Sequence, residues 1–432
     1  MRGSLLRAGL KLETRSKGFR RAVSCYNKSM LDYDYLIIGG GIAGTSAAET
    51  IRRADASARI AILEAEPDFL YSKVLLPDFV KGEVDLNKVM LRSIVNYEKN
   101  RIDFYPETVV SKIDFGRRDV FADERVFSYE KLLIASGGKV KVWKFEAGFP
   151  DKVFRLQTLV DATRLKEFLE RRKPARALVV GGGFIAIEFM NIFKHFGIQT
   201  KLLSRDRFFW ANFLDERGHS FLDNIFGDSK IEIVTSDEVR EISEREDDLE
   251  VLTQGGAGIA TDIVAAGIGL LRNFDFAGGV LNTGRGIFVD EFMLAEFKSG
   301  LGGNVWAAGD AAEYVDPYSG RRKVFGNWTH GFLTGHAAGL SMTGSKKPFR
   351  SVASYSVSFL GVPVAVIGTV DNQLAEEAFS DADNMGRKYG RFFLKGGKLI
   401  GALLLGAQKD TPRVIKMIES GEIIDRNIFK FT

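Results

Sequence analysis

Short apolar runs rich in β-branched residues alternate with segments of helical periodicity from Asp34 onward. Residues 35–39 (YLIIG) have the pattern of a buried strand, residues 43–54 (AGTSAAETIRRA) that of a helix with one apolar face, and residues 58–64 (ARIAILE) that of a second strand. Strands that alternate with helices in this way are typical of βαβ units on a parallel sheet. The pattern therefore predicts an α/β protein.

The same order of elements occurs a second time. Residues 176–183 (RALVVGGG), 184–197 (FIAIEFMNIFKHFG) and 199–205 (QTKLLSR) again predict a strand, a helix and a strand. Gly39 and Gly181 stand 142 residues apart, which is about the length of one domain. The chain is therefore expected to contain two Rossmann-like units, each a three-layer β/β/α nucleotide-binding domain.

The spacing of these patterns suggests four regions. Residues 117–138 predict a small antiparallel excursion with a return strand, and a Pro-marked linker near residue 174 follows a helix at 167–173. After residue 350 the pattern changes to alternating strands with a closing helix at 411–421. We expect a basic leader at 1–31, a first nucleotide-binding domain at 32–149 and 275–345, a second at 150–274, and a C-terminal α+β interface domain at 346–432.

The first 29 residues differ in charge from the rest of the chain. They hold eight basic residues and one acidic residue, whereas the full chain has a net charge of only +4, so the remaining chain is mildly acidic. The overall charge thus gives no support for nucleic-acid binding. An Arg-rich, nearly acid-free leader is typical of a transit peptide, with Met30 as the true start as the alternative. We expect a cytoplasmic protein, or an organelle-matrix protein if residues 1–29 are a transit peptide.

The composition also argues against several classes of chemistry. No run of eighteen apolar residues occurs, so no membrane span is expected, and the four histidines are too scattered to predict a metal site. The single cysteine, Cys25, allows no intrachain disulfide and precedes the first predicted strand. Such low cysteine usage fits a reducing compartment and argues against thiol catalysis.

The first glycine loop has the spacing of a dinucleotide-binding turn. In such a turn one glycine permits the tight bend, the next lets backbone amides approach a pyrophosphate, and the third allows close helix packing. Glu64, at the end of the next strand, can accept both ribose hydroxyl protons. The alternative is a glycine turn of another α/β fold beside a surface glutamate. The residues expected at this site are Gly39, Gly41, Ile42, Ala43, Gly44 and Glu64.

The second loop differs in the residue that follows its second strand. Ser204 stands where an NAD site would have Asp or Glu, and Arg205 and Arg207 come directly after it. Guanidinium groups beside a small hydroxyl can bind a 2′-phosphate, which predicts NADPH over NADH; solvated surface arginines are the alternative. The residues expected at this site are Gly181, Gly183, Phe184, Ile185, Ala186, Ser204, Arg205, Arg207 and Gly267.

The order of motifs over residues 33–432 resembles the FAD-dependent pyridine-nucleotide oxidoreductases, in particular the rubredoxin and ferredoxin reductase, nitrite reductase flavin-domain and apoptosis-inducing-factor branch. The similar segments are the two glycine loops, "YEKLLIASGG", "TDIVAAGIG" and "RGIFVDE" with "VWAAGDAAE". The resemblance implies that FAD binds to residues 32–149 and 275–345 and NAD(P)H to residues 150–274.

The resemblance also implies roles for single residues. Asp310, with Gly309, would hold the ribityl chain of FAD; Val110 would meet the adenine through its backbone; and Ala135 and Gly137 would line the passage between the domains. Lys73 would place a cation near the flavin, although a solvated helix residue is the alternative. The residues matched to positions near the flavin or nicotinamide are Glu188, on the first turn of its helix, Trp328, and His330, for which a packed or capping histidine is an equal alternative.

The chain departs from the family pattern in two places. Relatives with peroxide or coenzyme A disulfide chemistry carry a redox cysteine in the segment that here reads "DFLYSKVLLPDF", which has none. The Leu-Ser-Lys of ferredoxin-reductase relatives is Leu76, Pro77 and Asp78, so that lysine is missing. Without an internal thiol, electrons are expected to leave for an external acceptor.

The resemblance thus implies an NAD(P)H oxidoreductase that reduces FAD and then an external rubredoxin, ferredoxin, other iron-sulfur protein or small oxidant, with Lys73 and Glu188 as catalytic candidates. A possible homodimer would form through the C-terminal domain. The main alternative is an apoptosis-inducing-factor-like protein, in which NAD(P)H controls conformation or partner binding. A membrane quinone reductase is disfavoured, because the helix at 411–421 is short and has no broad lipid-facing stripe.

Overall fold

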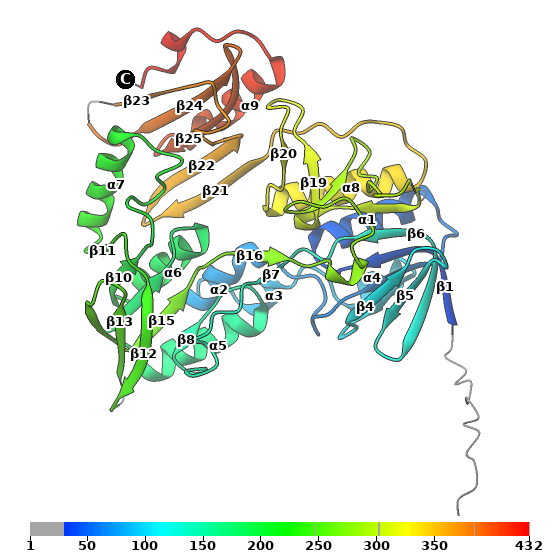
Figure 1. Ribbon diagram of the computed structural model, residues 1–432, viewed down its shortest axis with the longest axis horizontal. Coiled ribbons are helices and arrows are strands. Elements are labelled where there is room, and N and C mark those ends of the chain that lie inside the picture. Colours follow the sequence, from blue (N-terminus) through cyan, green and yellow to red (C-terminus); the bar gives the residue numbers. More distant parts are fainter. Residues whose placement is uncertain (1–29, 247, 301–302, 384, 432) are drawn as a thin grey trace, which may run out of the picture.

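The computed structural model describes residues 30–246, 248–300, 303–383 and 385–431 (Figure 1). The expected basic leader, apart from its last two residues, and Cys25 lie outside the described residues. The described chain forms two parallel, Rossmann-like sheets and a C-terminal antiparallel sheet, which confirms the predicted fold class. In the described part of the chain, no helix is long and apolar enough to cross a membrane.

The first Rossmann-like sheet has seven strands in the order β3-β2-β1-β6-β5-β4, with β18 paired to the second half of β6. The β6–β5 and β5–β4 pairs are antiparallel, and the other pairs are parallel. β1 lies between β2 and β6 and is parallel to both. Its core strand residues, Leu36 and Ile37, are fully buried. The strands are β1 (Met30–Ile38), β2 (Ile60–Leu63), β3 (Ile102–Tyr105), β4 (Val110–Asp114), β5 (Asp119–Ala122), β6 (Arg125–Ile134) and β18 (Val305–Ala307).

Helices and a small sheet complete this unit. The helices are α1 (Ile42–Ala54), α2 (Leu76–Lys81), α3 (Leu86–Val89), α4 (Ile94–Lys99) and α8 (Trp328–Met342), with short 3-10 turns at Lys73–Leu75, Asp275–Ala277 and Gly309–Ala311. The small sheet consists of β17 (Ile287–Val289), β19 (Ala312–Val315) and β20 (Arg322–Lys323).

Helices α1 and α8 pack closely because glycines of α8 face the backbone of α1. A Cβ atom on Gly335 would lie 2.1 Å from the carbonyl oxygen of Ala43, and one on Gly339 would lie 2.8 Å from that of Ala47. Real side chains do not tolerate such contacts, so these two positions need glycine. The packing holds α8 against the glycine loop that opens α1.

The second parallel sheet has the order β11-β10-β9-β15-β8. Its strands are β8 (Val153–Phe154), β9 (Arg176–Val180), β10 (Gln199–Leu203), β11 (Glu232–Val234) and β15 (Ile263–Ala266). An antiparallel sheet adjoins it, made of β12 (Val239–Arg245), β13 (Asp248–Thr253) and β14 (Gly258–Thr261). The helices of this part are α5 (Leu159–Arg172), α6 (Phe184–His195) and α7 (Glu216–Asp228).

The two parallel sheets share one arrangement. The neighbours β2-β1-β6 of the first sheet correspond to β10-β9-β15 of the second, and a helix follows the central strand in each. The repeat seen in the sequence is therefore a repeat of topology.

The chain passes between the two Rossmann-like sheets twice, once at β7 (Gly138–Val140) and once at β16 (Leu270–Arg272). These two strands pair as an antiparallel ribbon in the middle of the molecule (Figure 1). Beside the ribbon, the Ser136 hydroxyl donates to the Asn273 carbonyl at 2.5 Å, and the Asn273 side-chain amide donates to the Ser136 carbonyl at 3.1 Å. The domain boundaries at residues 150 and 275 stay predictions.

The C-terminal sheet is antiparallel throughout, in the order β21-β22-β25-β24-β23. Helix α9 (Thr411–Ser420) covers it with Val414 and Ile418, and a 3-10 turn at Arg426–Phe429 follows. The strands are β21 (Ser354–Phe359), β22 (Val362–Gly368), β23 (Glu377–Ala382), β24 (Tyr389–Lys395) and β25 (Lys398–Leu405).

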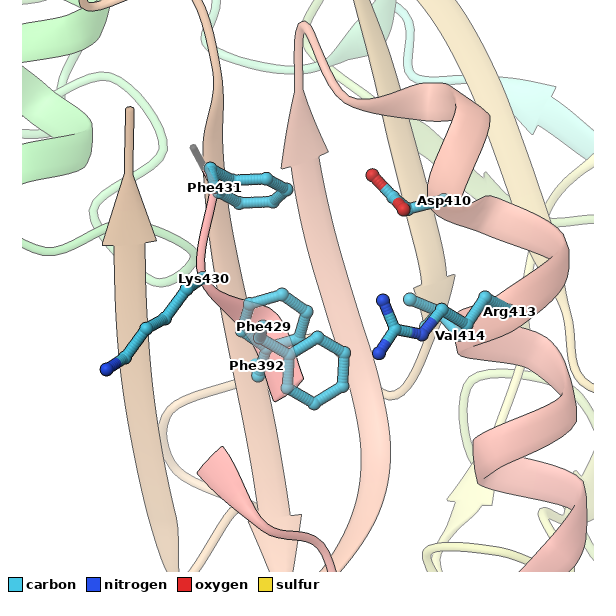
Figure 2. A pocket seen from close by; sticks show the side chains of 7 residues that line it. All are labelled: Phe392, Asp410, Arg413, Val414, Phe429, Lys430 and Phe431. Atoms are coloured by element: carbon cyan, nitrogen blue, oxygen red, sulfur yellow. The ribbon is translucent and has the colours of Figure 1, made fainter. Parts of the chain in front are cut away.

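A small cavity lies where the C-terminal segment returns to this sheet (Figure 2). The ring of Phe429 stacks on that of Phe392 at 3.8 Å, and the cavity that they border has a volume of about 40 Å³. Such a volume holds a water molecule but not a nucleotide, so this cavity is not a candidate cofactor site.

Candidate functional site

The first glycine loop connects β1 to α1 and has the geometry of a phosphate cradle. Gly39 has φ of +103°, and a Cβ atom there would lie 2.3 Å from the carbonyl oxygen of Ala135 at the end of β6. A Cβ atom on Gly44 would lie 1.9 Å from the carbonyl oxygen of Gly39, whereas one on Gly41 would meet nothing within 4 Å. Gly41 is the N-cap of α1 and leaves the first-turn amides without a side-chain acceptor. These amides can bind an anion.

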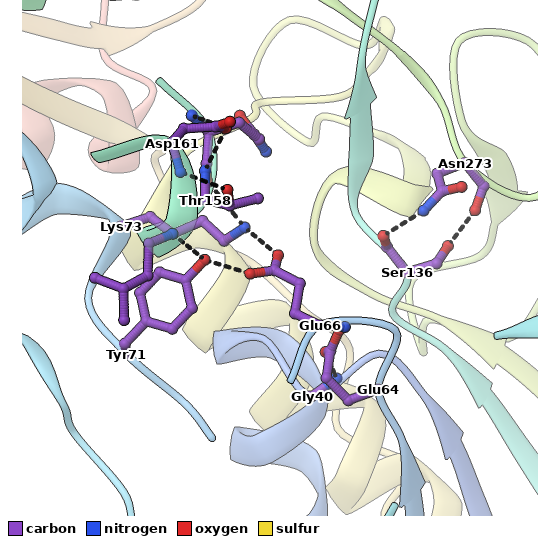
Figure 3. A network of polar contacts seen from close by, with 11 residues as sticks. Gly40, Glu64, Glu66, Tyr71, Lys73, Ser136, Thr158, Asp161 and Asn273 are labelled. Carbon is purple, nitrogen blue, oxygen red and sulfur yellow. Dashed lines mark hydrogen bonds and ion pairs between the residues drawn. The ribbon is translucent and has the colours of Figure 1, made fainter. Parts of the chain in front are cut away.

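Glu64 follows β2 at the edge of this cradle. Its carboxylate accepts the amide proton of Gly40 at 2.5 Å and that of Glu66 at 2.8 Å, so both oxygens are held in place (Figure 3). Burial raises the pKa of Glu64 above its ordinary value, while the two amides and Lys73 oppose the shift. A carboxylate fixed in this position can accept hydroxyl protons of a ribose.

The second glycine loop repeats this geometry between β9 and α6. Gly181 has φ of +125°, and a Cβ atom there would lie 2.3 Å from the carbonyl oxygen of Gly267 at the end of β15. A Cβ atom on Gly183, the N-cap of α6, would meet nothing within 4 Å. Ala186 takes the place of the third glycine, and a Cβ atom on Gly267 would lie only 2.9 Å from its amide nitrogen. The alanine is therefore accommodated because its neighbour is glycine.

The residues around the second loop differ in exposure. Ser204 is buried directly after β10, and Arg205 and Arg207 are exposed beside it. Within the described part of the chain, no carboxylate lies within ion-pair distance of either guanidinium. Phe184 and Ile185 open α6, and the ring of Phe184 contacts that of Tyr355 on β21 at 4.7 Å.

A third polar turn is the 3-10 turn at Gly309–Ala311, where the chain has returned to the first nucleotide-binding unit. Gly309 has φ of +65°, and its amide donates to the Thr334 hydroxyl on α8 at 3.0 Å. Asp310 comes next; burial raises the pKa of this carboxyl, and Lys73 opposes the shift. Trp328 is the first residue of α8 and is half-buried. The structure thus brings Asp310 and Lys73 within electrostatic reach of each other from distant parts of the sequence.

Lys73 belongs to a network that the sequence did not predict (Figure 3). Its ammonium donates to Glu66 at 2.9 Å and to the carbonyl oxygen of Gln157 at 3.2 Å. The Tyr71 hydroxyl donates to the other Glu66 oxygen at 2.5 Å and accepts the amide proton of Leu159 at 3.2 Å. Lys73 is thus held in place and is not a freely solvated helix residue.

Glu188 lies on α6 in a cleft of about 540 Å³ that α2, α6 and the β21–β22 turn enclose. Because α6 begins at Phe184, Glu188 is the fifth residue of the helix and lies on its second turn. The expectation that it lies on the first turn is therefore wrong. Burial and, to a lesser degree, the neighbouring Asp78 raise the pKa of Glu188 to about 7, while Lys81 and Asn191 oppose the shift. A carboxyl with this pKa can take up and release protons near neutral pH.

The remaining predicted residues lie around the first cradle. Ala135 is buried at the end of β6, against Gly39, and Gly137 follows with φ of +64°. Val110 is the first residue of β4, two positions after Thr108, whose amide donates to the Glu64 carbonyl oxygen at 2.7 Å. This hydrogen bond brings the start of β4 close to Glu64 in space, although 46 positions separate Val110 from Glu64 in the sequence.

His330 is a packed histidine on α8. Its side chain is 4% exposed, and its ring stacks on Tyr314 at 5.3 Å and contacts Phe325 and Phe349. Within the described residues, neither ring nitrogen has a hydrogen-bond partner, and burial lowers the pKa to about 4. His330 is therefore better described as a packed histidine than as a proton donor.

Acidification is expected to destabilise the protein through His330. Its pKa is about 4 in the folded protein and near 6.5 in the unfolded chain, so the unfolded chain binds the proton first as the pH falls. Between pH 7 and pH 4 the wild type should lose about 3 kcal/mol more unfolding free energy than His330→Phe does. Urea unfolding of both proteins at pH 7, 5.5 and 4 measures this difference; parallel pH profiles would contradict it.

The two cradles fit the cofactors that the sequence motifs imply. Each has open space at the N-cap glycine, a positive helix end and a glycine whose φ excludes other residues. Glu64 stands beside the first cradle, where an adenosine ribose would need a carboxylate, and Ser204 with two arginines stands beside the second. The first site fits FAD, and the second fits NAD(P)H.

Comparison with known protein families gives two matches. Residues 33–335 match the family described as pyridine nucleotide-disulphide oxidoreductase, and residues 356–422 match the rubredoxin NAD+ reductase C-terminal domain. Together the two matches span both parallel sheets and most of the C-terminal sheet.

Similar proteins cover most of the chain at low identity. The chain is 25% identical to a nitrite reductase [NAD(P)H] of Bacillus subtilis over 89% of its own length and 47% of that protein. It is 23% identical to mouse apoptosis-inducing factor 3, in a match that covers 96% of this chain and 68% of that protein. It is 24% identical to an NADH-rubredoxin oxidoreductase of Clostridium acetobutylicum, in a match that covers 90% of this chain and 95% of that protein. The chain thus spans about half of the nitrite reductase.

Solved structures share the fold. The putidaredoxin reductase–putidaredoxin complex matches with a TM-score of 0.84 at 19% identity, covering 92% of this chain and 95% of that one. A ferredoxin reductase from Rhodopseudomonas palustris matches with a TM-score of 0.80 at 21% identity, covering 91% and 98%. At these identities the likeness concerns the fold alone.

Proposed function

The chain belongs to the pyridine nucleotide-disulphide oxidoreductase family, and from this premise we propose that it is a flavoprotein that oxidises NADPH and passes the electrons to an external redox protein. The observation that carries the proposal is the pair of phosphate cradles, each with an open N-cap glycine. FAD, when bound, would supply the conversion between two-electron and one-electron transfer.

The residues of the chain bind and orient the two cofactors in this proposal. Gly39, Gly41 and Gly44 bring backbone amides to the FAD pyrophosphate, and Glu64 accepts the ribose hydroxyl protons. Asp310 orients the ribityl chain. Lys73 places a positive charge near the ring system, where it stabilises negative charge.

On the NAD(P)H side, Gly181, Gly183 and the first turn of α6 bind the pyrophosphate, and Gly267 leaves room beside Ala186. Glu188 holds or releases a proton in the cleft beside α2, because its pKa of about 7 allows both forms at neutral pH.

The proposed preference for NADPH rests on charge. Ser204 is the residue that follows β10, so no carboxylate at this position repels a 2′-phosphate. Arg205 and Arg207 are exposed beside it, and the segment stays positive even with Asp206 between them. Guanidinium groups bind phosphate with charge-assisted bonds that NADH cannot form.

The proposed acceptor is an iron-sulfur or rubredoxin-type protein. Cys25 is the only cysteine of the chain, so no pair of thiols can carry the electrons onward. The match of residues 356–422 to a rubredoxin reductase C-terminal domain and the putidaredoxin complex among the similar structures support a protein acceptor.

Anaerobic titration of the purified yellow protein tests the proposal. We expect NADPH to bleach the flavin faster than NADH does, with a kcat/KM ratio of at least about 10, since one charged contact is worth about 1.5 to 3 kcal/mol. Ferredoxins and a rubredoxin should then reoxidise the flavin. A colourless preparation would contradict the proposal, and an NADH preference would remove the NADPH assignment.

The likeness to apoptosis-inducing factor 3 over 96% of the chain favours a second candidate, in which NAD(P)H changes conformation or partner binding. The same titration separates the two: NAD(P)H that binds but reduces the flavin only slowly, with no turnover on any of the acceptors, would favour this candidate.

A further inference from the structure

One carboxylate joins two side chains that contact the same segment of backbone. Glu66 accepts a proton from the Tyr71 hydroxyl with one oxygen and from the Lys73 ammonium with the other. Burial and the charge of Glu66 raise the pKa of Tyr71, so its hydroxyl stays protonated and donates to the carboxylate. The Lys73 ammonium also lies 5.5 Å from the centre of the Tyr71 ring. We call these three residues the Glu66 clamp.

The clamp hydrogen-bonds to the start of α5, about 85 residues further along the chain. Lys73 donates to the carbonyl oxygen of Gln157, and Tyr71 accepts the amide proton of Leu159. Between them lies Thr158, the N-cap of α5, which forms a capping box with Asp161 (Figure 3). Leu159 carries one of the first-turn amides that have no partner within their own helix, so Tyr71 supplies a hydrogen bond that the helix lacks.

The clamp lies at the border between the two nucleotide-binding units. The cradle of the first unit is two residues away, because Glu64 accepts the amide proton of Glu66. The start of α5 belongs to the second unit, and residues of α2 and α5 share one apolar core. Lys73 is also the cation that opposes the raised pKa of Asp310. The clamp therefore contacts both units, and its lysine acts electrostatically on Asp310.

We propose that Glu66 is a positioning residue that fixes Lys73 beside the FAD site and holds the start of α5 against it. The Glu66 charge also sets how much positive charge Lys73 contributes there, since an ion pair partly cancels its field. The electrostatic part of this inference rests on the proposed function; the contact with α5 does not.

Amide exchange tests the contact. In the holoprotein, Tyr71→Phe removes the acceptor of the Leu159 amide, and exchange at Leu159 should become about five-fold faster, as for the loss of one hydrogen bond. Glu66→Gln should accelerate it to a smaller extent. Glu232→Gln, which breaks the 2.8 Å ion pair with Lys201 between β10 and β11, should change nothing. Unchanged exchange in Tyr71→Phe would overturn the contact.

The flavin midpoint potential tests the electrostatic part, in dye-equilibrated titrations that need neither NADPH nor an acceptor. Glu66→Gln should raise the potential, because the cation of Lys73 is no longer neutralised and favours the reduced, anionic flavin. Lys73→Gln should lower it, and Tyr71→Phe and Glu232→Gln should leave it nearly unchanged. If the clamp had only a structural role, Glu66→Gln and Lys73→Gln would not shift the flavin potential in opposite directions.

Equal potentials in wild type, Glu66→Gln and Lys73→Gln would overturn the positioning role. If Glu66→Gln does not retain flavin, the Lys73→Gln potential and the Tyr71→Phe exchange still decide the two parts. If NADPH fails to reduce the protein while these shifts occur, the proposed function fails and the clamp stands.

Discussion

Gly41→Val is expected to give a folded protein that has lost FAD. A Cβ atom at this position would meet no protein atom within 4 Å, and the extended backbone at φ of −65° suits any residue. The fold should therefore tolerate the new side chain. The valine side chain would fill the space above the first turn of α1, where the pyrophosphate must approach the amides. We expect FAD affinity to fall at least about 100-fold, or about 3 kcal/mol.

The measurement is flavin absorbance after gel filtration, together with circular dichroism of the flavin-free protein. Gly44→Val is the contrasting variant, since a Cβ atom there would lie 1.9 Å from the Gly39 carbonyl oxygen and should disturb the packing of α1 itself. Gly227→Val is the matched control on α7, because it also meets no atom within 4 Å. A yellow Gly41→Val protein with wild-type affinity would show that FAD does not bind at this loop.

Gly183→Val is expected to keep FAD and to lose reduction by NADPH. This glycine has the same place in the second cradle as Gly41 in the first: it is the N-cap of α6, and a Cβ atom would meet nothing within 4 Å. The valine would occupy only the space of the NADPH pyrophosphate. The kcat/KM for NADPH should therefore fall at least about 100-fold, while dithionite still reduces the flavin.

Stopped-flow reduction by NADPH and by dithionite separates these two outcomes in one preparation. Loss of both reductions would indicate damage to the FAD site, and the retained yellow colour controls for that. Normal reduction by NADPH would contradict the assignment of the second cradle, because no pyrophosphate could then lie against the first turn of α6.

The sequence predicted the features that depend on local backbone geometry. Gly39 and Gly181 need positive φ next to a neighbouring strand, and a residue type that permits this conformation is visible in the sequence alone. The repeat of strand, loop, helix and strand, and the strands with a closing helix after residue 350, follow from apolar periodicity in the same way.

Other features depend on contacts between distant residues and were missed. Glu66 and Tyr71 gave no signal, because their roles depend on Gln157 and Leu159, more than 80 residues away. Helix α7 and the pairing of β7 with β16 were also missed. The start of α5 was placed too late, although Thr158 and Asp161 form a capping box that the sequence displays.

The place of β18 in the first sheet has a consequence for synthesis on the ribosome. β18 pairs with the second half of β6, yet 170 residues separate Ile134 from Val305, and the whole second parallel sheet lies between them. Because a nascent chain folds as it emerges, the inserted unit can become compact while the second half of β6 still has no neighbour on the side where β5 pairs with its first half. Until residue 307 leaves the exit tunnel, that open edge can pair with strands of other chains, so the late arrival of β18 is the step most exposed to aggregation.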